Sequence, residues 1–146
     1  MNIRPESLRE ENKECLLEFL ISNKDMETTF NPHPFTLEAI NFLLQKTKDQ
    51  FILFFVEETV VGYGLLQGWD AGYVVPSLGI AVDRLYRGTE VSKYIMNYLH
   101  LLARIKGSNR VRLTVKKDNI AAINLYKNFG YILEEFPDMY IGVLDL

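Results

Sequence analysis

Residues 119–131 of the chain read Asn119-Ile120-Ala121-Ala122-Ile123-Asn124-Leu125-Tyr126-Lys127-Asn128-Phe129-Gly130-Tyr131. Asn119 is suited to cap a helix, because its side-chain oxygen can accept a hydrogen bond from an amide of the first turn. Four apolar residues then recur at the spacing of one helix face: Ala122, Leu125, Tyr126 and Phe129. Gly130 follows at the position where a glycine commonly ends a helix. The stretch therefore predicts a short, capped helix.

A second informative junction lies upstream and reads Ile80-Ala81-Val82-Asp83-Arg84-Leu85-Tyr86-Arg87-Gly88-Thr89-Glu90-Val91-Ser92. It predicts a strand that passes through a loop into a helix. The first amides of such a helix have no partner within it, and its dipole is positive at that end, so the junction favours an anion such as pyrophosphate. A single glycine in such a loop is a weak signal, and an ordinary helix start is the alternative.

Hydrophobic periodicity and turn residues predict the remaining elements. We expect strands over residues 1–4, 51–56, 60–67, 74–82, 110–115, 131–135 and 139–143, and helices over 7–22, 36–48, 89–106 and 119–129. Ser7 and Thr36 are expected to cap the first two helices. The order β-α-α-β-β-β-α-β-α-β-β predicts an α/β (α+β) fold, with one mixed, mostly antiparallel sheet of six to seven strands flanked by about four helices.

Length and composition exclude several classes of protein. The 146 residues predict a single domain over 1–146. A formal charge of −3 leaves no basic excess to neutralise nucleic acid. The single cysteine, Cys15, excludes an internal disulfide or a cluster of thiolate metal ligands, and no apolar run reaches the ~20 residues of a membrane span. Without a secretory signal, we expect a cytoplasmic protein without a metal, and we leave open whether it forms a homodimer.

The two quoted stretches together resemble the GNAT superfamily of acyl-CoA-dependent N-acetyltransferases. The family pattern is an L/I-x-V strand, then [RQ]-x-x-G-x-[GA], and later N-x-x-A-x-x-L-Y-x-x-x-G-[FY]. Residues 119–131 match the last part at every position, and Ile80-x-Val82 matches the first. In Arg87-x-x-Glu90-x-Ser92, Glu90 stands where the family has its first glycine. With the order of elements, the resemblance covers about residues 3–136.

The resemblance implies where acetyl-CoA binds. The backbone of the strand residues Leu78, Ile80, Ala81 and Val82 would pair with the pantetheine arm. Amides of the next segment, Arg87, Gly88, Thr89, Glu90, Val91 and Ser92, would hold the pyrophosphate, with Arg87 adding charge. Asn119 and Tyr126 would lie beside the pantetheine and the sulfur. A carboxylate at Glu90 would repel the phosphates unless it points to solvent while its N–H still binds.

The resemblance also implies the reaction, in which an amine of a small molecule or peptide attacks the thioester directly. An N–H near Ile80 would stabilise the oxyanion, and Tyr126 would protonate the departing thiolate; alternatively, Tyr126 only packs on the sheet. Substrate contacts are expected from His33, Trp69, Asp70 and Ser77, and a water chain to a general base would end on His33, Asp70, Ser77 or a backbone carbonyl. Two other readings stay open: a sugar hydroxyl as acceptor, or a CoA-binding regulatory or scaffold module that has lost turnover, which Glu90 favours.

Overall fold

A computed structural model describes residues 1–146 of the chain. Seven strands form one mixed sheet in the order β1-β2-β3-β4-β5-β7-β6. The strands are β1 Arg4–Ser7, β2 Gln50–Val56, β3 Thr59–Gln67, β4 Ser77–Val82, β5 Arg110–Lys116, β6 Ile132–Glu135 and β7 Met139–Asp145. The helices are α1 Lys13–Ser22, α2 Leu37–Leu43, α3 Glu90–Ile105 and α4 Ile120–Asn128, with a 3-10 helix, η1, at Lys24–Thr28. The predicted fold class and order of elements are confirmed.

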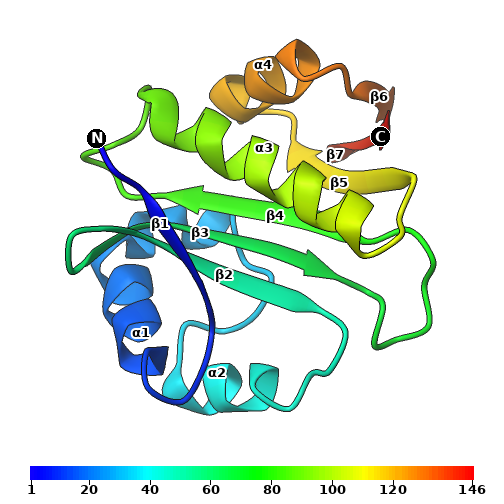
Figure 1. Cartoon of the computed structure of the whole chain (residues 1–146). Helices are drawn as coiled ribbons and strands as arrows, with labels where there is room; N and C mark the ends of the chain where they lie inside the picture. The colour runs from blue at the N-terminus through cyan, green and yellow to red at the C-terminus, as the bar shows by residue number, and fades with distance from the viewer.

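The helices cover the two faces of the sheet in pairs, α1 and α2 on one face and α3 and α4 on the other (Figure 1). The inner strand β2 is buried from Phe51 to Phe55 and sends alternate side chains to the two faces. This explains why its sequence is continuously apolar rather than alternating, since a strand covered on both faces has no solvated side. No helix is long and apolar enough to cross a membrane.

The sheet opens between β4 and β5. All six residues of β4 pair with β3 in antiparallel register. Toward the parallel strand β5, only Ser77 has a partner, Arg112, whose N–H donates to the Pro76 carbonyl at 3.0 Å. From Leu78 onward, the edge of β4 that faces β5 therefore has no ladder partner. Backbone groups along that edge are available to another extended chain.

Three predicted boundaries near the N-terminal half are wrong. Strand β1 covers Arg4–Ser7 instead of residues 1–4, because Ser7 pairs with Ile52 and does not cap a helix. Pro5 lies inside β1, which is an edge strand, where a missing N–H is tolerated. Helix α1 consequently begins at Lys13, after Asn12, and the 3-10 helix η1 that follows α1 was not predicted.

Two further boundaries differ, at the end of α2 and at the start of β4. Helix α2 ends at Leu43 rather than near residue 48, because the amides of Thr47, Lys48 and Asp49 donate to the Asp70 carboxylate instead of continuing the helix. Strand β4 begins at Ser77 rather than at residue 74, and Val74 is exposed. Apolar character alone does not keep a segment within a sheet when it has no partner there.

Candidate functional site

The open edge of β4 is lined by a continuous stretch of the chain. Leu78, Ala81 and Val82 are buried, and Ile80 is half-buried. Because every β4 residue is held by β3 on one side, the strand presents its other edge in a fixed, extended conformation. This is the geometry that a linear ligand carrying amide groups can join as an additional strand.

The chain leaves β4 and turns into α3 through a loop with unpaired amides. Gly88 has a φ of +76°, a left-handed conformation that glycine adopts without strain. Thr89 caps α3, and its side-chain oxygen accepts a hydrogen bond from Val91 N at 3.3 Å. The amides of Gly88, Glu90 and Ser92 donate no hydrogen bond within the chain. With the positive end of the 16-residue helix α3, these amides form an arrangement suited to an anion.

Two charged side chains of this loop already have protein partners. The Arg87 guanidinium donates from Nε to the Val82 carbonyl at 3.0 Å and pairs with Asp25 at 3.1 Å, which lowers the pKa of Asp25. The Glu90 side chain is 82% exposed and lies 3.6 Å from Lys93 Nζ. Glu90 therefore points to solvent, whereas its N–H stays free at the start of α3.

Tyr126 lies on α4 with its ring packed 5.8 Å from the ring of Tyr131. Burial raises the pKa of Tyr126 to about 12, so its hydroxyl carries a proton throughout the neutral range. The hydroxyl makes no hydrogen bond in the chain, yet no enclosed polar side-chain atom lacks a partner, so this oxygen still reaches solvent-accessible space. Asn119 caps α4, as predicted, and accepts from Ala122 N at 3.2 Å.

His33 is joined to a residue that the sequence did not single out. Its Nδ1 donates to the Pro34 carbonyl at 2.8 Å, which leaves Nε2 to accept from the Tyr63 hydroxyl at 2.9 Å. Burial lowers the pKa of His33 and raises that of Tyr63, so both groups are neutral at neutral pH. Tyr63 is opposite Ala81 of β4, on the face covered by α1 and α2. Tyr63 lies within an ordinary strand pattern, so only its contact with His33 in the folded structure shows that it belongs to this group of residues.

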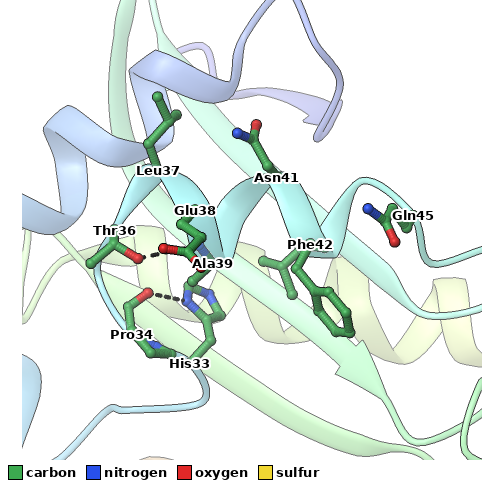
Figure 2. A pocket seen from close by; sticks show the side chains of 10 residues that line it. His33, Pro34, Thr36, Leu37, Glu38, Ala39, Asn41, Phe42 and Gln45 are labelled. Carbon is green, nitrogen blue, oxygen red and sulfur yellow. Dashed lines mark hydrogen bonds between the residues drawn. The ribbon is translucent and has the colours of Figure 1, made fainter.

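His33 also lines an open hollow of about 850 Å³ along α2. Figure 2 shows the rings of His33 and Phe42 on the same side of this helix. Trp69 lines a different hollow of about 390 Å³, together with Tyr73 and Lys106. The two aromatic candidates for acceptor contacts therefore face separate surface features.

The remaining polar candidates have partners in the chain. The Asp70 carboxylate accepts from the amides of residues 47–49, led by a 2.7 Å bond from Asp49 N, and these bonds lower the pKa of Asp70 to about 2. Asp70 therefore holds the 47–49 turn against the loop between β3 and β4. Ser77 Oγ accepts from Arg112 at 3.3 Å, at the point where β4 and β5 still pair.

Comparisons with known proteins agree with this geometry. The acetyltransferase (GNAT) family matches residues 9–131. An acetyltransferase of the GNAT family from Streptococcus pneumoniae superposes with a TM-score of 0.81 at 18% identity, covering 99% of this chain and 100% of that one. The PaiA N-acetyltransferase from Thermoplasma acidophilum, solved in complex with coenzyme A, gives 0.81 at 18% identity, with full coverage of both chains.

A third solved structure, the ribosomal-protein-S5-alanine acetyltransferase from Vibrio fischeri, gives a TM-score of 0.80 at 10% identity, covering 99% of this chain and 93% of that one. No curated protein matches the chain significantly. These structures share the fold, and the family match extends over most of the sequence, including both stretches that define the β4–α3 junction and α4. The chain belongs to the GNAT family of acetyltransferases.

Proposed function

We propose that the protein transfers the acetyl group of acetyl-CoA to an amine of a small molecule or peptide. The observation that carries this proposal is the opening between β4 and β5 directly before a helix start with unpaired amides. The opening suits the pantetheine arm, which has amides to pair with a strand edge, and the helix start suits the pyrophosphate. An acyl-CoA needs both features, one after the other, along the same stretch of chain.

In this proposal, residues 78–82 pair with the pantetheine arm, and the amides of Gly88, Glu90 and Ser92 bind the pyrophosphate. Arg87 acts chiefly by holding the loop, since its guanidinium is already engaged by Val82 and Asp25. An N–H near Ile80 would stabilise the oxyanion that forms when the amine attacks the thioester carbon.

The reaction needs two proton transfers, one to the departing sulfur and one from the attacking amine. As the new C–N bond forms and the C–S bond breaks, Tyr126 donates its hydroxyl proton to the departing thiolate sulfur. The attacking amine must lose a proton to a base. In this proposal the water chain ends at the Tyr63–His33 pair, where the Tyr63 hydroxyl passes its proton to Nε2 of neutral His33 as it takes one up, whereas the Asp70 carboxylate is occupied by amides.

The test is a transfer assay that follows release of free thiol from acetyl-CoA with a panel of polyamines, amino sugars, sugars and peptide N-termini. We expect acceptor-dependent thiol release and a product heavier by one acetyl group. An amide product resists hydroxylamine, whereas an ester formed on a sugar hydroxyl is cleaved by it.

Glu90 at the usual glycine position favours a second candidate, a CoA-binding module without turnover. Tight acetyl-CoA binding without thiol release across the panel would favour that candidate.

A further inference from the structure

A buried amide side chain at the C-terminal end of α1 reaches across to the loop that follows β4. Asn23 is 0% exposed, and its Nδ2 donates to Asp83 Oδ2 at 3.0 Å and to the Phe19 carbonyl at 2.9 Å. Its Oδ1 accepts from the amide of Arg84 at 3.0 Å. Asn23 thereby uses both ends of its amide to join two segments that are about 60 residues apart in sequence.

Asp83 carries this connection into the loop. Its second carboxylate oxygen accepts from the amide of Leu85 at 3.0 Å, and its own N–H donates to the Val61 carbonyl of β3 at 2.9 Å. The loop is thus tied to β3 at one point and to α1 at another. The unpaired amides of Gly88, Glu90 and Ser92 follow only a few residues later.

A second contact also joins the segment after α1 to the β4–α3 loop. Asp25, in η1 directly after Asn23, pairs with Arg87, and Arg87 also donates to the Val82 carbonyl. The Arg87–Asp25 pair is exposed on both sides, so it contributes little by itself. The contacts of Asn23, whose own side chain is fully buried, are the stronger restraint.

We propose that Asn23 is a positioning residue for the phosphate-binding amides of the acetyl-CoA site. It fixes the start of the β4–α3 loop, so that the following amides already converge before the ligand arrives. A loop that becomes ordered only on binding loses conformational entropy, which lowers its affinity for the ligand. A loop that is already ordered does not have this loss. This inference rests on the proposed function and adds a residue outside the family motif.

The test compares two ligands and two buried asparagines by calorimetry. Acetyl-CoA contains the pyrophosphate, and S-acetylpantetheine lacks it. Asn23→Ala removes the connection, and Asn12→Ala is the matched control, because Asn12 is 4% exposed and binds Arg9 N and the Ser7 carbonyl at the opposite end of α1. We expect Asn23→Ala to raise the Kd for acetyl-CoA about tenfold. The Kd for S-acetylpantetheine should change less than about twofold, and Asn12→Ala should change neither.

Each other outcome is decisive. Equal loss of both ligands in Asn23→Ala would show a general structural role and overturn the inference, as would an unchanged Kd for acetyl-CoA. If the unsubstituted protein binds S-acetylpantetheine but not acetyl-CoA, the phosphate site and this inference fail together. If it binds neither ligand, the proposed function itself fails.

A second pair of variants serves if Asn23→Ala does not fold. Asn23→Asp keeps the size of the side chain but sets two carboxylates against each other. Asn23→Asp with Asp83→Asn restores the bond between residues 23 and 83 with donor and acceptor exchanged, while the bond to the Phe19 carbonyl stays lost in both variants. The single variant should weaken acetyl-CoA binding, and the double variant should recover at least half of the lost factor. Failure of the double variant to recover any affinity, while folded, would contradict the inference.

Discussion

Among single residues, Tyr126 has a hydroxyl that is protonated at neutral pH and free to donate. Burial raises its pKa to about 12, and its hydroxyl is not bound to another group of the chain. We expect Tyr126→Phe to lower kcat by roughly 10²–10⁴-fold, the usual contribution of general acid catalysis, with little change in acetyl-CoA affinity. Steady-state kinetics with a verified acceptor measures this.

Tyr131→Phe is the matched control for that variant. Tyr131 neighbours Tyr126, but its hydroxyl bonds the buried His100 Nε2 at 2.7 Å. Its removal leaves a buried nitrogen unpaired, which should lower the free energy of unfolding by about 1–3 kcal/mol without a loss in kcat. Near-full turnover in Tyr126→Phe, with chemistry rate-limiting, would return Tyr126 to a packing role.

Glu90 gives a second prediction for a single residue. Its carboxylate is exposed and paired with Lys93, so it repels bound phosphates through solvent rather than by direct contact. Glu90→Gln should tighten acetyl-CoA binding by about two- to fivefold at low salt, and the gain should vanish near 1 M salt, where charges are screened beyond about 3 Å. Calorimetry at two salt concentrations checks this.

The control for Glu90 removes the same charge from another helix. Glu14 is exposed in the first turn of α1, so Glu14→Gln matches the change in net charge and in helix position. It should leave acetyl-CoA affinity unchanged. An equal gain in both variants would point to net charge rather than to a local effect at α3.

The role of a residue could be predicted from the sequence only when its hydrogen-bond partner lies nearby in the sequence. The caps Thr36 and Asn119 bond amides three residues ahead, and both were predicted. Tyr63 and Asn23 bond partners 30 and 60 residues away, and neither was singled out. Nothing in the local sequence around a buried tyrosine or asparagine indicates which distant group it meets.

At the scale of elements, the same principle governs the boundaries. Helix α3 carries a strong periodic pattern and extends from Glu90 to Ile105, within the expected range. The limits of α1, α2 and β4 were misplaced, because each depends on pairing with another segment: β1 with β2, the 47–49 turn with Asp70, and β4 with β3. The pairing of the β4 backbone with a pantetheine arm was implied by the family resemblance alone, since no local pattern encodes the opening between β4 and β5.

Helix α3 packs so closely against β3 that position 64 favours a glycine. A Cβ on Gly64 would lie 3.0 Å from Leu99 Cδ1 and 3.2 Å from Ile95 Cγ2, closer than ordinary contact. Gly64→Val should therefore lower the free energy of unfolding by about 1–3 kcal/mol through overpacking against α3. Urea unfolding measures this, with Thr114→Val on an exposed position of β5 as the control. A neutral Gly64→Val would mean that α3 moves away from the sheet at no cost.

At the scale of the whole molecule, stability should depend on pH through His100. Burial, with a smaller effect of Arg104, lowers the pKa of His100 to about 4, whereas in the unfolded chain it is near 6.5. Between these values the unfolded state binds more protons, so the free energy of unfolding falls as the pH drops, by up to about 3 kcal/mol. The lowered pKa of His33 acts in the same direction.

Urea unfolding at about pH 7 and about pH 4.5 measures this dependence. His100→Gln keeps a hydrogen-bonding side chain beside Tyr131 and removes the titration, so it should flatten the pH profile. A profile equally steep in His100→Gln and in the unsubstituted protein would assign the acid sensitivity to carboxylates instead.

In the proposed complex, acetyl-CoA lies along the open edge of β4 with its phosphates at the start of α3. Amide hydrogen exchange of the full chain, with and without saturating CoA, tests it most directly. We expect slower exchange in residues 78–82 and 87–92 and no change along α2. Unchanged exchange at millimolar CoA, or protection confined to the hollow lined by residues 33–45, would contradict it.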